Sequence, residues 1–312
     1  MGRVRNVALA ALATVATIGV VSFAAAAEPE LAALSGNRTN PVKVVESKSQ
    51  RGRQSRIVGG RVVGDLDRET GSQFFAKIFT PDGTGFYCAG SLVSPSHVLT
   101  RAGCDVQTGD VVRVGGTKLF GGLEYKVSKV NKHPGFDPVG DIHDIAMLTL
   151  SKPRSEASMI RAGVAPVALN FNFGTPHGFY VAGFGATDKK AATAGSLQLK
   201  RGYQPLRSWE QCEAIFKQVR LPNGKLLPIN KSAQVCTNYL SFQSGALCDR
   251  DVGGPMFRAD TKWIGGVKTT QYTLYAVSSF WIGTAEERCP QGLPNVGTKV
   301  AYYKQWIQAA MA

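Results

Sequence analysis

Beyond residue 57 the chain alternates short runs of β-branched and aromatic residues with glycine, proline, aspartate or asparagine. Such runs, bounded by residues that favour turns, are typical of short strands rather than long helices. The clearest examples are Phe74–Phe79, His97–Thr100, Val111–Val114, Ile145–Leu150 and Tyr180–Gly183. This pattern predicts an all-β domain built as a barrel or a sandwich.

Two segments have helical spacing instead. A helix is expected from Ser208 to Val219, because Ser208 can cap it and apolar residues recur every three or four positions beyond the cap. A second helix is expected from Tyr302 to Ala310 at the end of the chain. Trp306 and Ile307 would pack this helix onto the strands.

The first 27 residues have the composition of a secretory signal peptide. Arg3 and Arg5 precede an alanine-rich apolar run from Val7 to Phe23, and Ala25 to Ala27 offer a cleavage site. The alternative is an uncleaved membrane anchor, because the run is nearly long enough to cross a bilayer. We expect cleavage of residues 1–27, and a secreted, extracellular protein that has no membrane partner afterwards.

Residues 28–56 are polar, contain no cysteine and mix proline, serine and asparagine with basic residues. This composition predicts a flexible propeptide or linker with little core of its own. The segment ends in a basic run, Arg51 to Arg56, that a protease specific for basic residues can cut. Residues 57–312 then form the folded domain.

Cysteine usage agrees with an extracellular location. The chain has six cysteines, all beyond residue 87, and none forms a metal-type C-x-x-C pair. An even number without metal spacing predicts disulfides, although spacing alone leaves every pairing open. No metal or cofactor is expected. Asn37 and Asn230 begin N-x-S/T triplets and are candidate glycosylation sites.

The formal net charge is +14, of which residues 57–312 carry +9. A generally basic, solvated surface explains this excess without any function. The functional interpretation is attraction to acidic protein surfaces or polyanionic glycans. The sequence shows no nucleic-acid-binding motif, and secretion argues against such a partner.

Three stretches of the domain resemble the trypsin-like serine proteases (chymotrypsin fold, peptidase family S1). They are RIVGG at residues 56–60, DIHDIAML at 141–148 and CDRDVGGP at 248–255. With shorter matches elsewhere, the resemblance covers about residues 57–310. It implies two six-stranded antiparallel β-barrels followed by a C-terminal helix. It also implies the disulfide pairs Cys88–Cys104, Cys212–Cys236 and Cys248–Cys289.

The resemblance places the catalytic positions of the family on residues that cannot perform the chemistry. Members use a serine nucleophile, a histidine base and an aspartate that orients the histidine. The matching positions here are Val252, Gly103 and Asp144. Valine and glycine offer no side-chain atom that attacks a carbonyl carbon or accepts a proton, so we expect a protein that is not an enzyme. Asp144 is expected to accept hydrogen bonds from nearby backbone or hydroxyl groups.

The rest of the expected cleft is altered as well. The residue that should present an amide to the oxyanion is Arg250 instead of glycine. The floor of the substrate pocket is Ala246, which has no carboxylate to hold a basic side chain. Matching Ser278 to the serine in the pocket wall places Phe280 at the pocket mouth; the alternative is a shift of one residue, which the nearby Trp281 allows. His143 is expected to face away from the partner of Asp144, because neighbours in a strand point to opposite sides.

The activation switch of the family is matched in this chain. Cleavage after Arg56 would free the amine of Ile57, which in the family pairs with the aspartate at the position of Asp251. Because a buried charge needs a partner, we expect the cut chain to become more rigid without gaining an active site. The alternative is that these residues are relics.

These features predict a catalytically inactive homologue that acts by binding a protein. The sequence at residues 91–100 and 251–255 is similar to that of the glucanase inhibitor proteins of plant-pathogenic oomycetes. Members of that group are secreted, inactive and bind host endo-β-1,3-glucanases, so the resemblance implies a role in virulence. The alternatives are a basic binder of acidic glycans, a regulator of a protease cascade and, last, an active serine endopeptidase.

Overall fold

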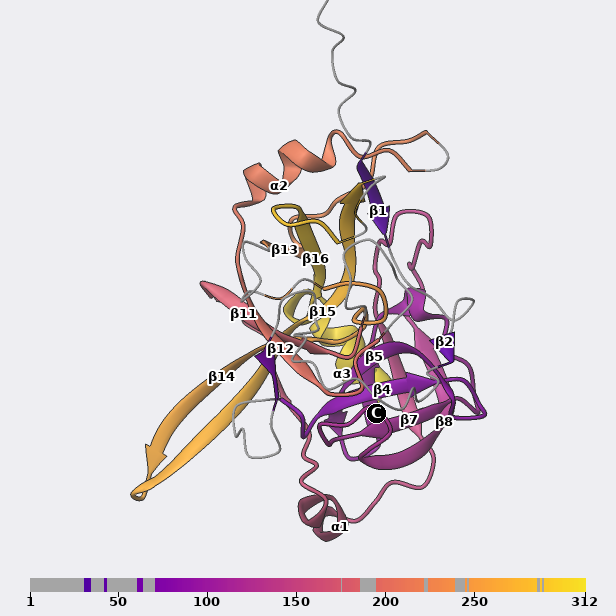
Figure 1. Ribbon diagram of the computed structural model, residues 1–312, viewed down its shortest axis with the longest axis vertical. Coiled ribbons are helices and arrows are strands. Elements are labelled where there is room, and N and C mark those ends of the chain that lie inside the picture. Colours follow the sequence, from indigo (N-terminus) through magenta and orange to yellow (C-terminus); the bar gives the residue numbers. More distant parts are fainter. Residues whose placement is uncertain are drawn as a thin grey trace, which may run out of the picture.

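The computed structural model describes residues 31–34, 42–43, 61–63, 71–174, 176–185, 195–221, 224–238, 245, 247–284, 287 and 289–312. Strands dominate this part of the chain, and they form two sheets that lie against each other (Figure 1). The predicted signal peptide lies outside the described residues, as do Asn37, Arg56, Ile57 and Ala246. No helix in the described part of the chain is long and apolar enough to cross a bilayer.

The first sheet is a closed barrel of six antiparallel strands. Its strands are β4 (Phe75–Phe79), β5 (Gly85–Ser94), β6 (His97–Thr100), β7 (Val111–Val114), β8 (Leu123–Lys132) and β9 (Ala146–Leu150). Their order is β5-β4-β7-β8-β9-β6, and β6 pairs back onto β5. The buried faces of these strands fill the barrel with apolar side chains, as the runs of β-branched and aromatic residues predict.

The second sheet contains six antiparallel strands in the order β12-β11-β14-β15-β16-β13. They are β11 (Gly178–Gly183), β12 (Lys200–Pro205), β13 (Gln234–Asn238), β14 (Pro255–Ile264), β15 (Val267–Thr284) and β16 (Pro294–Lys299). Three short strands extend it: β3 (Arg61–Val62) pairs with β12, β10 (Ala168–Leu169) runs parallel to β15, and β1 (Leu31–Leu34) pairs antiparallel with β15.

The predicted fold class is confirmed, with one correction: the second barrel is not closed by a ladder. Among the described residues, β12 and β13 are joined by one isolated bridge between Leu206 and Thr237. The hydroxyl of Thr237 also donates to the side-chain oxygen of Gln204 at 2.7 Å. Just beyond the end of β12, the Arg207 amide donates to the Cys236 carbonyl at 3.0 Å.

The helices are short and lie outside the sheets. Helix α2 (Trp209–Phe216) begins where predicted, and the Ser208 hydroxyl accepts a hydrogen bond from the Gln211 amide at 3.2 Å. A 3-10 turn (Val300–Tyr303) leads into α3 (Lys304–Met311), so the last helix begins later than predicted. Helix α1 (Glu156–Arg161) was not predicted, because six residues are too few for a periodic apolar pattern.

Part of the segment expected to be flexible forms strands. Strand β1 (Leu31–Leu34) pairs antiparallel with residues 281–284 of β15, and β2 (Val42–Lys43) pairs with residues 85–86 of β5. The expectation of a flexible segment is therefore corrected at these positions, because backbone hydrogen bonds to existing sheet edges need no apolar core.

Aromatic packing joins the two sheets. The ring of Phe184, just after β11, lies 5.6 Å from Phe75 and 6.2 Å from Phe86 of the first barrel, centroid to centroid. All three rings are buried. The three predicted disulfides are confirmed: Cys88–Cys104, Cys212–Cys236 and Cys248–Cys289. The Cys88–Cys104 bridge lies between the sheets, next to the candidate site.

Candidate functional site

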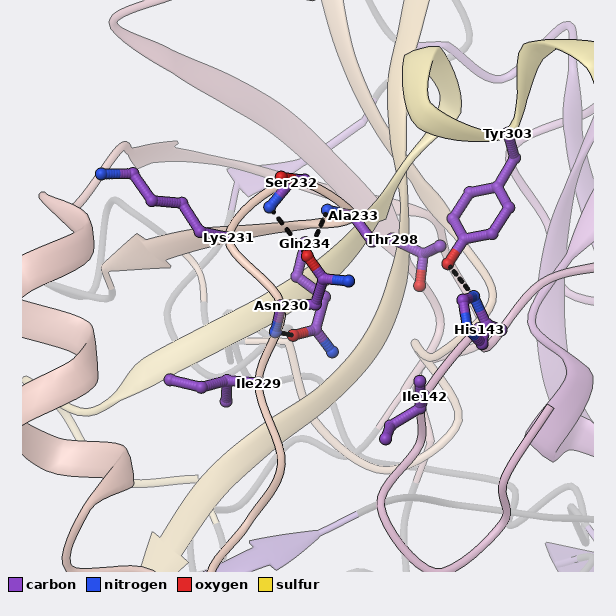
Figure 2. Close-up of a pocket in the computed structure, with 10 residues that line it drawn as sticks. All are labelled: Ile142, His143, Ile229, Asn230, Lys231, Ser232, Ala233, Gln234, Thr298 and Tyr303. Atoms are coloured by element: carbon purple, nitrogen blue, oxygen red, sulfur yellow. Dashed lines mark hydrogen bonds between the residues drawn. The ribbon is translucent and has the colours of Figure 1, made fainter. Parts of the chain in front are cut away.

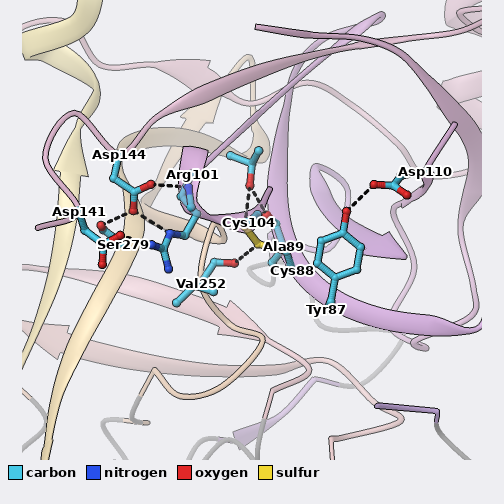
Figure 3. The surroundings of a disulfide bond; sticks show 12 residues. Tyr87, Cys88, Ala89, Arg101, Cys104, Asp110, Asp141, Asp144, Val252 and Ser279 are labelled. Carbon is cyan, nitrogen blue, oxygen red and sulfur yellow. Dashed lines mark hydrogen bonds and ion pairs between the residues drawn. A yellow bond between two sulfur atoms is a disulfide. The ribbon is translucent and has the colours of Figure 1, made fainter. Parts of the chain in front are cut away.

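Four segments from both sheets meet beside the Cys88–Cys104 disulfide (Figure 3). The first sheet contributes Arg101, which follows β6, and Asp144, which precedes β9. The second sheet contributes Val252, in the turn before β14, and Ser279 in β15. The structure thus brings Gly103, Asp144 and Val252 to one region, as the resemblance implies for catalytic positions.

Asp144 is buried, and its carboxylate is held by three donors. One oxygen accepts from the Gly103 amide at 2.8 Å. The other accepts from Nε of Arg101 at 2.7 Å and from the Ser279 hydroxyl at 2.5 Å. A buried carboxylate requires such partners, because desolvation strongly disfavours an isolated charge. Backbone and hydroxyl donors match the sequence prediction, whereas the arginine does not.

Arg101 is the residue that sequence reasoning missed. Its guanidinium is 1% exposed and forms a second ion pair, from Nη2 to Asp141 at 2.5 Å. Burial acts to lower the pKa of Arg101, but the carboxylates of Asp141 and Asp144 raise it overall. The arginine is therefore a fixed, buried cation at the centre of this site (Figure 3).

Arg101 also occupies the space beside Gly103. A Cβ atom on Gly103 would collide with the guanidinium, so no larger residue fits there while Arg101 keeps its position. The sequence could have indicated this arrangement, because the side chains at positions 101 and 103 change in size in opposite directions relative to the family. The family reads Thr-Ala-Ala-His-Cys where this chain reads TRAGC at 100–104, with a large residue for a small one and a small residue for a large one.

Val252 is 1% exposed and contributes only its backbone to polar contacts in this region. Its carbonyl accepts from the Ala89 amide at 3.0 Å, which ties the turn to β5. The isopropyl side chain has no atom that can act as a nucleophile. Together, Gly103 and Val252 leave no side-chain base or nucleophile at the two positions that match those roles.

The turn before Val252 keeps a backbone conformation that favours glycine. Arg250 has φ +73°, in the left-handed region that costs a non-glycine residue roughly 1 kcal/mol. It is 7% exposed, and burial lowers the pKa of its guanidinium. The change from glycine therefore preserves the turn geometry while placing a large cation beside it.

Asp251 is fully buried behind this turn. Its carboxylate accepts from the Gly185 amide at 2.7 Å and from the Cys248 amide at 3.2 Å. Burial raises its pKa to about 7, and the two amides only partly oppose that rise. The predicted partner of Asp251, the amine of Ile57, lies outside the described residues.

The placement of Phe280 needs a correction. Its ring is 2% exposed and packs in an apolar cluster with Phe216 and Val296. The residue of β15 that reaches Asp144 is Ser279, not Ser278. A bulge in the β15–β16 ladder between Ser278 and Phe280 shifts the register by one residue. A one-residue shift sends each side chain to the opposite face, so Phe280 points into the core.

His143 lies outside the site, for a reason other than strand alternation. It is not in a strand and has φ +52°. Its ring stacks on His133, with 4.9 Å between the ring centroids. Figure 2 shows its other contact, in which Nδ1 lies 2.9 Å from the Tyr303 hydroxyl. His143 lines a cavity of about 340 Å³ together with Asn230.

The candidate glycosylation triplet at Asn230 forms a tight turn. Oδ1 of Asn230 accepts hydrogen bonds from the Ser232 and Ala233 amides at 3.0 and 3.3 Å.

A second cavity, of about 430 Å³, opens beside Arg101 and Gly103. Lys132 and Asp105, which form an ion pair at 2.6 Å, also line it. Among the residues that the structure describes, no cluster of three histidine, cysteine or acidic side chains could hold a metal ion. The charged side chains that line this cavity pair with one another, Arg101 with Asp141 and Lys132 with Asp105.

The fold and the site define the class of protein, and a family comparison agrees. The family model named Trypsin matches residues 61–307, so the chain belongs to the trypsin family. A structural neighbour is neuropsin, a serine protease expressed in the limbic system of mouse brain. It has a TM-score of 0.60 and 22% identity, and the alignment covers 77% of this chain and 95% of neuropsin.

Individual relatives are of different kinds. Trypsin 5G1 of Aedes aegypti is 28% identical over 257 residues, which are 80% of this chain and 84% of the relative. A trypsin-like protease of Streptomyces glaucescens is 30% identical, and the alignment covers 72% of this chain and 74% of that protease. Glucanase inhibitor protein 3 of Phytophthora infestans is 27% identical and covers 81% and 87%, respectively.

Proposed function

We propose that this chain is a secreted, catalytically inactive serine protease homologue that acts by binding another protein. The observation that carries the proposal is the buried Arg101, which pairs with Asp144 and fills the space of a side chain at Gly103. A histidine base cannot enter that space, and Val252 supplies no nucleophile. Loss of either group removes most of the rate in this chemistry, and here both positions are changed.

Secretion is supported by the leader composition and by the three disulfides. A rigid scaffold of two sheets leaves the loops and the exposed edges to recognise a partner. For the target we propose a plant endo-β-1,3-glucanase, because a glucanase inhibitor protein is among the relatives and is matched over most of its length.

Two assays test the proposal. A fluorophosphonate probe, which labels activated serines, should leave this protein unlabelled while it labels an active trypsin in the same reaction. The protein should also slow hydrolysis of a soluble β-1,3-glucan by a purified plant endo-β-1,3-glucanase, whereas heat-unfolded protein should not. Labelling by the probe would overturn the inactive state, and an unchanged hydrolysis rate would overturn that target.

A second candidate, binding of polyanionic glycans, is favoured by the charge of +9 on residues 57–312. Binding that depends on surface charge weakens steeply with salt, because ions screen it. Binding to immobilised heparin that disappears at moderate salt, with no effect on the glucanase, would favour this candidate. Inhibition that persists at high salt would favour the protein inhibitor.

A further inference from the structure

The second sheet continues into a two-stranded arm. Strands β14 and β15 remain paired as far as Ile264 and Val267. Strand β11 pairs with β14 only at residues 256–257, and β10 pairs with β15 only at residues 273–274. Among the described residues, the arm formed by residues 258–264 and 267–272 therefore has no other strand beside it, and it projects away from both sheets (Figure 1).

The arm ends in a two-residue turn at Gly265 and Gly266. Both have positive φ, +58° and +81°, as a type I′ hairpin turn requires. A Cβ atom added to either would meet nothing within 4 Å. The glycines are thus explained by the turn itself, and the turn lies in open solvent.

Trp263 stands in water next to this turn, with 73% of its surface exposed. Alternate residues of a strand share a face, so Trp263 lies on the same face as Thr261. At the base of that face Tyr272 is buried, with its ring 5.6 Å from Phe74 and 6.0 Å from Phe257. Farther out, the Thr261 and Thr270 hydroxyls pair at 3.2 Å. The face therefore changes from core to solvent before it reaches the tryptophan.

The sequence of the tip is apolar between two lysines. Residues 263–267 read WIGGV, with Lys262 before them and Lys268 after them, and the backbone register places Trp263 opposite Lys268. Tryptophan is common in protein interfaces, but lysine is depleted there. Tryptophan and lysine together are typical of the membrane–water interface, where the indole enters the headgroup layer and basic charge is attracted to anionic lipids.

We propose that the tip of this arm, residues 262–268, binds the surface of an anionic lipid bilayer, with Trp263 as its apolar anchor. The formal charge of +9 on residues 57–312 favours such a surface. This peripheral contact goes beyond the protein binding proposed above, and it replaces the expectation that the processed chain has no membrane partner. The tip lies on the arm and the candidate site lies between the sheets, so Trp263→Ala leaves the residues of that site unchanged.

Co-sedimentation with phospholipid vesicles tests the proposal on the secreted chain, from which the apolar residues 1–27 have been removed. The protein should sediment with mixed phosphatidylcholine–phosphatidylserine vesicles and much less with phosphatidylcholine alone. Trp263→Ala should weaken the binding by about tenfold or more, because it removes the anchor. Lys262→Gln combined with Lys268→Gln should reduce both the binding and its salt dependence.

Ile160→Ala is the matched control, because Ile160 is 66% exposed on α1, away from the arm. Equal binding of the Ile160→Ala variant and the unmodified protein, with weak binding of the Trp263→Ala variant, supports the proposal. No sedimentation, or equal sedimentation of the Trp263→Ala variant, overturns it. Size-exclusion chromatography that shows a dimer dependent on Trp263 would also overturn it, since a second copy would then cover the tip.

Discussion

The guanidinium of Arg101 lies in the volume that a side chain at position 103 would need, and Gly103 is the residue that leaves this volume free. The same guanidinium donates to Asp144 at 2.7 Å. Asp144 thus keeps a side-chain N–H donor, but the donor comes from a different position of the chain and is a cation. Because the two residues share one space, they should behave as a single coupled change.

Gly103→His should be strongly destabilising on its own, by about 3 kcal/mol, because it overpacks the site and disturbs a buried ion pair. In an Arg101→Ala background the same change should cost at least about 1 kcal/mol less, since the space is then free. Urea unfolding of the two single variants and the double variant gives the coupling. Ala165→His, at an exposed site, is the size control. Additive effects would contradict the shared volume.

Ser279 and Ser278 provide a matched test of the strand register. Ser279 donates to the buried Asp144, whereas the Ser278 hydroxyl has no hydrogen-bond partner among the described residues. Ser279→Ala should therefore lower the free energy of unfolding by about 1.5–3 kcal/mol, the range for hydrogen bonds to charged groups. Ser278→Ala should change it little. Thermal unfolding of both variants measures the two losses of stability. A larger loss in Ser278→Ala than in Ser279→Ala would support the register expected from sequence.

Asp251 should make stability depend on pH. Its folded pKa of about 7 lies above the ordinary value of 3.8, so the folded state holds a proton that the unfolded state has lost. Its contribution is complete below about pH 4 and is lost as pH rises through about 7, at up to about 1.4 kcal/mol per pH unit. Urea unfolding across this range should show the slope, and Asp251→Asn should remove it.

Cleavage after Arg56 tests whether the carboxylate of Asp251 gains a partner. If the new amine of Ile57 pairs with Asp251, the ionised carboxylate gains a partner and the melting temperature near neutral pH should rise. Asp251→Asn should abolish that rise. Differential scanning calorimetry of cut and uncut protein measures it. Equal melting temperatures in the unmodified chain would show that the switch residues are relics.

Lys77 should make the free energy of unfolding increase with pH, opposite to the effect of Asp251. Its ammonium is buried and donates to the carbonyls of Gly115, Lys118 and Gly121 at 2.6, 3.2 and 2.8 Å. Burial lowers its pKa from 10.5 to about 7, with Arg113 adding to the effect. Between these values the unfolded chain binds the extra proton, so stability should increase with pH. Lys77→Met should flatten this increase in urea unfolding, whereas Lys126→Met, at an exposed position, should not.

The fold was accessible from sequence because its signals are local. Val111–Val114 and His97–Thr100 read as strands from their own composition, and the structure places strands at those positions. Ser208 likewise marks the start of α2 by its own side chain. The disulfide pairs required the family resemblance, because spacing alone leaves all pairings open.

The site was only partly accessible, because its decisive contacts join distant positions. The exchange of size between Arg101 and Gly103 is visible in the sequence, but its meaning depends on where the guanidinium points. The contact of Ser279 with Asp144 depends on a bulge between β15 and β16; Trp281 allowed this shift of one residue, but the sequence did not select it. Asp141 becomes part of the site through the same arginine.

Strands β1 and β2 attach the segment before Arg56 to both sheets. One pairs with the second sheet and the other with the first, so the segment reaches across both. It contains no cysteine and so no disulfide, and apart from the strand pairing it is the peptide chain that keeps it at a high effective concentration near those edges. A cut after Arg56 would turn it into a separate peptide that dilutes away, and residues 281–284 and 85–86 would then be open strand edges for another chain.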